Sequence, residues 1–212
     1  MPDYTPLALQ HLDSTLGSRT VEAYEVATEQ HPHLGGIAVK LDSSHSFFEA
    51  SNLGLAGSHI SMLADKPQYI NHIKSGATKA RMADFSKLLR EKGVTPSVPE
   101  LVTSVFLHEL GHAEDYHQYI QRAGGDVKAA FRTSREIRKS EIARLPLGIA
   151  SSRALRAWNT NTNGYRDSMT KAGHTQDSFM QLINRNIEAY AKLPSEQIAD
   201  RFALGVLATM YS

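Results

Sequence analysis

The chain has 212 residues, of which 41% are hydrophobic and 21% charged, so it holds enough apolar material for one compact domain with its own core. A formal net charge of +1 gives no general attraction to nucleic acid or to a membrane surface. Cysteine is absent, which excludes disulfides, thiolate chemistry and zinc sites with sulfur ligands. We find no signal peptide pattern and no apolar stretch long enough to cross a bilayer, so we expect a single cytoplasmic domain over residues 1–212.

The N-terminal third combines helices with a small sheet. Apolar residues at spacings of three and four predict helices over 6–16 and 20–30, and the His-Pro-His-Leu-Gly-Gly segment at 31–36 breaks that pattern. The segments 37–41 and 59–63 alternate in polarity and are rich in branched residues. They predict a small, irregular antiparallel sheet.

The remainder of the chain is predicted to be helical. We expect helices over residues 67–92, 98–121, 126–145, 177–192 and 194–210. The Asn-rich segment 159–164 is predicted to be a loop. The sequence therefore indicates an α+β fold that is predominantly α-helical, with a small antiparallel sheet near its N-terminal half.

The helix predicted at 98–121 contains the motif HELGH, with His108, Glu109 and His112. Residues four apart share one face of an α-helix, so both imidazoles can reach the same ion, while Glu109 points about a quarter turn aside. A zinc ion held by two such imidazoles lowers the pKa of a bound water, and a nearby carboxylate takes the proton. The motif predicts a Zn²⁺ site with Glu109 as general base, although a fortuitous match is the alternative. Gly111 inside the motif would let a neighbouring element come close.

A catalytic zinc site needs a third protein ligand. The pattern HExxHxxGxxH, which takes it from the same helix, is disfavoured because Asp115 and Gln118 occupy its Gly and His positions. The last helix offers Glu196 and Asp200, which are four residues apart and share a face. We expect Glu196 to bind the metal and Asp200 to hydrogen-bond the outer nitrogen of His108. The alternative is that Glu196 favours the helix dipole and that Asp200 pairs with a surface cation.

The pair HELGH and ExxADRFA resembles the gluzincin group of zinc metallopeptidases, and covers about 14 residues in two blocks. Thermolysin-like enzymes, the CAAX-processing membrane proteases and the soluble relatives of those proteases carry similar blocks. The resemblance implies a zincin-like active-site helix, His108, His112 and Glu196 as zinc ligands, Glu109 as base and a peptide or protein as substrate. It also implies that an edge strand of the small sheet pairs with an extended peptide. The 83 residues between His112 and Glu196 exceed the spacing of thermolysin-like enzymes, and membrane spans are missing.

A peptidase also needs a donor for the developing oxyanion. Tyr165, His174, Arg166 and Tyr190 lie between the two motif blocks, and we select Tyr165 and His174 as the catalytic candidates. Tyr165 follows the Asn-rich segment, where a loop could border a cleft. The alternative is that Tyr165 and Tyr190 are ordinary packing residues.

A cationic stretch on the helix at 126–145 has two interpretations. Its cations are Lys128, Arg132, Arg135, Arg138, Lys139 and Arg144. We favour a solvated helix face over contact with an acidic partner or nucleic acid. The competing functions are therefore an active peptidase, a metal-binding regulatory domain with a single partner, and a helical interaction or nucleic-acid-binding module. The sequence leaves the substrate and the oligomeric state open.

Overall fold

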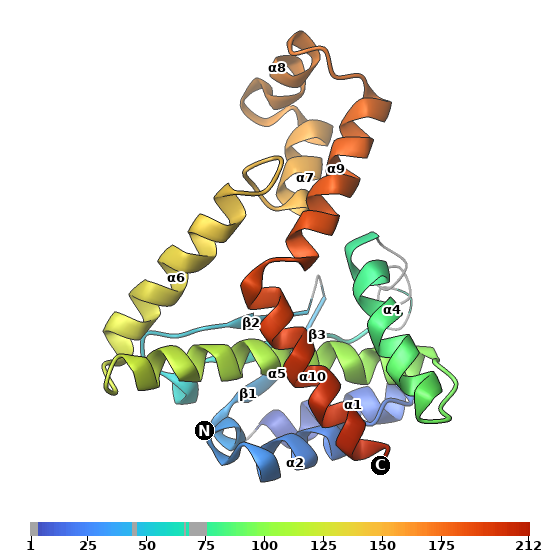
Figure 1. Ribbon diagram of the computed structural model, residues 1–212, viewed down its shortest axis with the longest axis vertical. Coiled ribbons are helices and arrows are strands. Elements are labelled where there is room, and N and C mark those ends of the chain that lie inside the picture. Colours follow the sequence, from blue (N-terminus) through green and yellow to red (C-terminus); the bar gives the residue numbers. More distant parts are fainter. Residues whose placement is uncertain (1–3, 44–45, 66, 68–75) are drawn as a thin grey trace.

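A computed structural model describes residues 4–43, 46–65, 67 and 76–212 (Figure 1). The two N-terminal helices, α1 (Tyr4–Leu16) and α2 (Thr20–Gln30), form at the predicted positions. A short 3₁₀-helix, η1 (Pro32–Gly36), follows and leads into the sheet. Helix α4 (Gly76–Glu91) belongs to the helix predicted at 67–92, of which residues 68–75 lie outside the described residues.

The sheet has three strands in the order β1-β3-β2, which are β1 (Ala38–Asp42), β2 (Phe47–Glu49) and β3 (His59–Leu63). The prediction of an antiparallel sheet from the two segments was wrong, because β1 and β3 pair in parallel. The sequence pattern missed β2, a strand of only three residues that pairs antiparallel with β3. Because the chain reverses once into β2 and again into β3, the first and last strands run in the same direction.

Two long helices form the centre of the molecule, α5 (Val98–Arg122) and α10 (Pro194–Met210), and both confirm the predicted ranges. Each begins with a proline in its first turn, where the missing N–H leaves no helical hydrogen bond unmade. Helix α5 ends before Gly124 and Gly125, whose positive φ angles of 63° and 89° suit glycine. In Figure 1, α10 crosses α5 at a steep angle, with α1 and α2 below.

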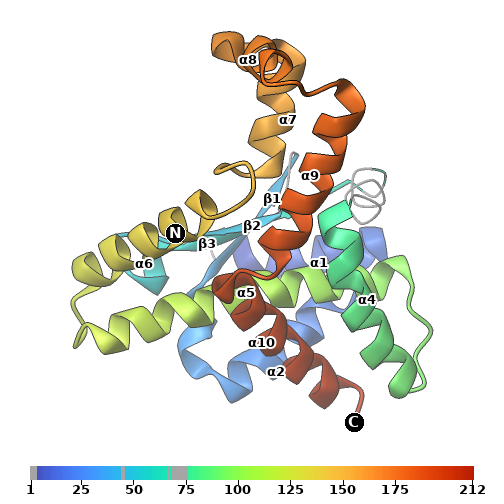
Figure 2. The ribbon, with the colours of Figure 1, turned by 45° about the horizontal axis from the view of Figure 1, so that its top comes forward.

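The chain between α5 and α10 is a helical excursion, and its elements are α6 (Val127–Ala143), α7 (Ser151–Thr160), η3 (Thr162–Gly164), α8 (Tyr165–Lys171) and α9 (Gln176–Ala191). Figures 1 and 2 show α6 and α9 rising from the central helices toward α7 and α8. The sequence analysis did not predict α7 and α8. The predicted loop at 159–164 is correct only in part, because its first two residues close α7.

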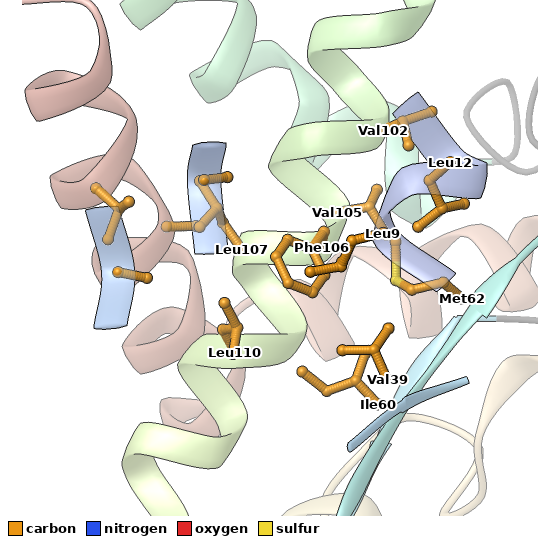
Figure 3. Packing of buried hydrophobic residues seen from close by; sticks show 14 of the residues in the cluster. Leu9, Leu12, Val39, Ile60, Met62, Val102, Val105, Phe106, Leu107 and Leu110 are labelled. Atoms are coloured by element: carbon orange, nitrogen blue, oxygen red, sulfur yellow. The ribbon is translucent and has the colours of Figure 1, made fainter. Parts of the chain in front are cut away.

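The main core lies between α5, the sheet and the terminal helices. Phe106 of α5 is fully buried, and Figure 3 shows its ring among side chains of α1, α5 and the sheet. A second, smaller cluster fixes the tip of the excursion, where Trp158 stacks on Phe179 with ring centroids 4.0 Å apart. Within the described ranges, every helix is too short or too polar to cross a bilayer.

Gly111 is the point at which the two central helices touch backbone to backbone. A Cβ atom placed on Gly111 would lie 2.6 Å from the Cα atom and 2.7 Å from the carbonyl oxygen of Ala199 on α10. Only glycine permits this approach, because backbone atoms cannot move aside as a flexible side chain can. The expectation that Gly111 lets a neighbouring element come close is therefore confirmed.

We expect Gly111→Ala to lower the free energy of unfolding by about 1–3 kcal/mol, because the added methyl group forces α10 away from α5. The matched control is Gly205→Ala on α10, where a Cβ meets no atom within 4 Å. That change should be neutral or stabilise by up to about 1 kcal/mol through helix propensity. Urea unfolding of both variants tests the pair, and equal effects of the two changes would contradict the close-contact argument.

Candidate metal centre

Helix α5 places its HELGH motif inside the protein. His108 and Glu109 are 2% and 8% exposed, and the side chain of His112 is 17% exposed. The flanking residues Phe106, Leu107 and Leu110 are fully buried and anchor this part of α5 in the core. Polar groups at such positions cost free energy unless they have partners. The neighbouring helices supply several of these partners.

Glu196, in the first turn of α10, meets both motif histidines. It is 1% exposed, and its two carboxylate oxygens lie 3.4 Å from Nε2 of His108 and 3.5 Å from Nε2 of His112. Three ligand atoms at a tetrahedral zinc, each about 2.0–2.1 Å from the metal, are separated by about 3.3–3.4 Å. Both imidazole–carboxylate distances are close to this separation, and two imidazoles with one carboxylate are a donor set that suits zinc.

Asp200 completes the surroundings of His108. Its Oδ1 atom lies 2.8 Å from Nδ1 of His108, which is the contact that the spacing of Glu196 and Asp200 predicts. When Nδ1–H donates to this carboxylate, the lone pair of Nε2 is directed toward Glu196. The hydrogen bond between Asp200 and His108 thus sets the tautomer of His108 and the direction of its ring.

Arg138 of α6 also binds Glu196, so the prediction that it lies on a solvated helix face was wrong. Its Nη2 atom donates to Oε1 of Glu196 at 2.5 Å and contacts the hydroxyl of Tyr190 on α9. Burial opposes the positive charge of Arg138, but the nearby carboxylates outweigh this effect, so the pKa of the guanidinium lies above its ordinary value. Amphipathic periodicity cannot single out one cation among six on the same helix.

Glu141, one turn beyond Arg138, is also buried and holds the start of α10. Its two oxygens accept hydrogen bonds from the backbone N–H and the hydroxyl of Ser195, at 3.2 and 2.6 Å. The residue that precedes α10 supplies no side-chain cap, so a carboxylate from another helix takes that role. Glu141 therefore fixes the turn that carries Glu196, a function that sequence spacing alone does not reveal.

The structure does not bring Tyr165 and His174 to the His-Glu cluster. Figures 1 and 2 both place α8 at the far tip of the excursion, away from α5 and α10. Tyr165 packs edge-on against Phe179 in the second hydrophobic cluster, and His174 lies in the turn between α8 and α9. The predicted loop at 159–164 borders this packed tip rather than the cluster, so the structure does not support a role for these two residues beside His108 and His112.

Asp115 is a buried carboxylate on α5, three residues after His112 and on the same side of the helix. Within the described residues, its Oδ1 atom has no hydrogen-bond partner. Burial raises the pKa of Asp115 to about 6, with Arg122 and Arg138 opposing and Glu141 and Glu114 adding to the rise. Asp115 therefore takes up a proton more readily in the folded protein than in the unfolded chain.

Asp115→Asn should stabilise the metal-free protein at pH 7.5 by about 1–3 kcal/mol. Because the folded pKa exceeds the unfolded value of 3.8, the folded state binds more protons between these values, and wild-type stability falls as the pH rises through this window. The advantage of the variant should vanish near pH 4. Unfolding titrations in a chelating buffer at both pH values measure it, and an advantage independent of pH would contradict this account.

Replacing Arg138 by Met should destabilise the metal-free protein by about 1–3 kcal/mol, because Glu196 loses a charged partner that is itself partly exposed. Added Zn²⁺ should then raise the unfolding temperature of this variant more than that of the wild type, since the ion supplies the missing positive charge. Arg132→Met on the exposed face of α6 is the matched control, and it should match the wild type in both measurements. An equal response of Arg138→Met and wild type to Zn²⁺ would count against the charge argument.

Comparisons with protein families, with curated proteins and with solved structures found no match to this chain. What the chain does is therefore argued from the residues around Glu196 and from their chemistry.

Proposed function

We propose that this protein is a zinc-dependent peptidase of the gluzincin type. The observation that supports it best is the meeting of His108, His112 and Glu196, whose ligand atoms lie within 4.8 Å of one another although 83 residues separate the two motif blocks. A fortuitous HExxH motif gives no reason for a buried carboxylate from another helix to face both imidazoles. This convergence favours a metal site over a helical interaction module.

When bound, zinc acts as a Lewis acid and makes water more acidic. His108, His112 and Glu196 hold the ion, while Asp200 keeps the ring of His108 in the tautomer that presents Nε2. Glu109 accepts a proton from the attacking water while the oxygen of that water bonds to the carbonyl carbon. Glu109 then passes this proton to the leaving amine as the C–N bond breaks.

Tyr190 replaces Tyr165 and His174 in this proposal as the donor near the reacting carbonyl. Among the donors between the two motif blocks, Tyr190 is linked to Glu196 through a shared hydrogen-bond partner, Arg138. A phenol beside a fixed guanidinium is a suitable donor to a developing negative charge. Its position at the base of α9 supports this role better than the distal location of Tyr165.

The small sheet supports a peptide as substrate. Strand β2 is an edge strand, and Tyr116 of α5 donates a hydrogen bond of 2.7 Å from its hydroxyl to the carbonyl oxygen of Ser51, just after β2. Tyr116 is one helical turn beyond His112, so this end of β2 lies beside the motif face of α5. An extended peptide could pair with such an edge.

A cytoplasmic location is also part of the proposal and rests on the sequence alone.

Zinc analysis together with a peptidase assay tests this proposal. We expect Glu109→Gln to keep the zinc of the cluster and to lower kcat at least about a hundred-fold, because only the proton acceptor is lost. His112→Ala and Glu196→Gln should lose both that zinc and the activity. Release of peptides from an unstructured protein such as casein measures activity.

Two outcomes would contradict the proposal. Equal zinc in the wild type and in His112→Ala would remove the assignment of the ligands. Full activity in Glu109→Gln would remove the assignment of the base and favour a metal-binding regulatory domain. Circular dichroism of each variant checks that the fold is retained.

A further inference from the structure

A second cluster of metal-binding residue types lies on another side of α5. His31 and His33 come from the connection between α2 and β1, and Glu114 comes from α5, two residues after His112. Two residues correspond to about 200° around a helix, so Glu114 points away from the face that carries His112. The ligand atoms of the three side chains lie within 4.8 Å of one another.

The local sequence fixes both histidines against α5. Pro32 disfavours a helical backbone at the preceding His31, whose φ of −131° and ψ of 74° are non-helical. Pro32 also begins the 3₁₀-helix η1 that contains His33. The ring of His33 stacks on that of His117, with centroids 3.8 Å apart and planes 13° from parallel. The ring of His31 packs against Phe202 of α10 at 5.1 Å. Both imidazoles are therefore oriented by neighbours other than Glu114.

Glu114 makes one short contact and one longer contact to the two imidazoles. Nε2 of His33 is 2.5 Å from Oε2 of Glu114, which is a hydrogen bond. Nδ1 of His31 faces the same oxygen at 3.5 Å, close to the separation of about 3.3 Å between two ligands of a tetrahedral zinc. The second imidazole is not needed for the hydrogen bond, and it brings the number of metal-binding side chains at this place to three.

The cluster is also open to solvent, as a site filled from solution must be. The side chains of His31 and His33 are 33% and 27% exposed. His31 and Glu114 line a groove of about 560 Å³ between α5 and α10. Arg122 and Arg201 also line this groove, and both are exposed.

We propose that His31, His33 and Glu114 form a second site for an imidazole-preferring divalent ion, with Zn²⁺ as the expected occupant. Two imidazoles and one carboxylate suit zinc, and the groove leaves the fourth position to water. The bound ion would link the α2–β1 connection to α5 and so hold the segment that leads into β1. This site is independent of the cluster around Glu196.

Zinc stoichiometry tests the second site. After equilibration with Zn²⁺ and removal of unbound ion, we expect about two zinc ions per chain for the wild type and about one for His33→Ala and for Glu114→Gln. His112→Ala should also retain about one, and His33→Ala combined with His112→Ala should retain none. His11→Ala, which alters an exposed histidine of α1, is the control and should match the wild type.

A second measurement uses thermal unfolding of the His112→Ala variant. Its unfolding temperature should rise with added Zn²⁺, and this rise should disappear when His33→Ala is combined with it. The second site is refuted if His33→Ala and Glu114→Gln bind as much zinc as the wild type. Loss of zinc in His33→Ala but not in His112→Ala would instead refute the proposed peptidase centre and leave the second site standing.

Discussion

The backbone contact between Gly111 and Ala199 sets where Glu196 lies relative to His108 and His112. It brings the backbone of α10 so close to α5 that a Cβ atom at position 111 would not fit, and Glu196 and Asp200 flank Ala199 on the same side of α10. A carboxylate side chain is short, so Glu196 reaches the imidazoles only when the two helix axes are this close. The absence of a Cβ atom at Gly111 is therefore as important to the cluster as the ligands themselves.

The charges around Glu196 form a second constraint. A buried carboxylate is tolerated only with partners, and Glu196 has Arg138 and two imidazoles within 3.5 Å. Arg138 stands on α6 and Tyr190 on α9, so the two arms of the excursion converge at the cluster. The long insertion between the motif blocks thus contributes directly to the surroundings of the ligands, whereas its tip is held by separate packing around Trp158.

Much of this arrangement follows from sequence, and the rest fails for identifiable reasons. Periodicity and proline positions predict α5 and α10 closely, and spacing predicts that His108 and Asp200 meet. The contact between Arg138 and Glu196 could not be predicted because the two residues are 58 positions apart. Helical periodicity shows only which side of a helix is polar. Tyr165 was chosen for the loop before it, but packing against Phe179 decides where that segment lies. Strand β2 is too short to show alternation in its sequence, so it was not predicted. Without β2 between them in the chain, β1 and β3 were predicted to run antiparallel, although they run parallel.

The long sequence separation between α10 and the N-terminal helices has a consequence for the order of assembly. Ala203, Val206 and Leu207 of α10 belong to the same core as the side chains of α1 and α2. The N-terminal helices emerge from the ribosome first, yet their core stays open until the last helix has been synthesised. Contacts between such distant segments slow folding, because a long loop must close before any of them forms. The His-Glu cluster therefore forms only after α10 has been synthesised and has packed onto α5.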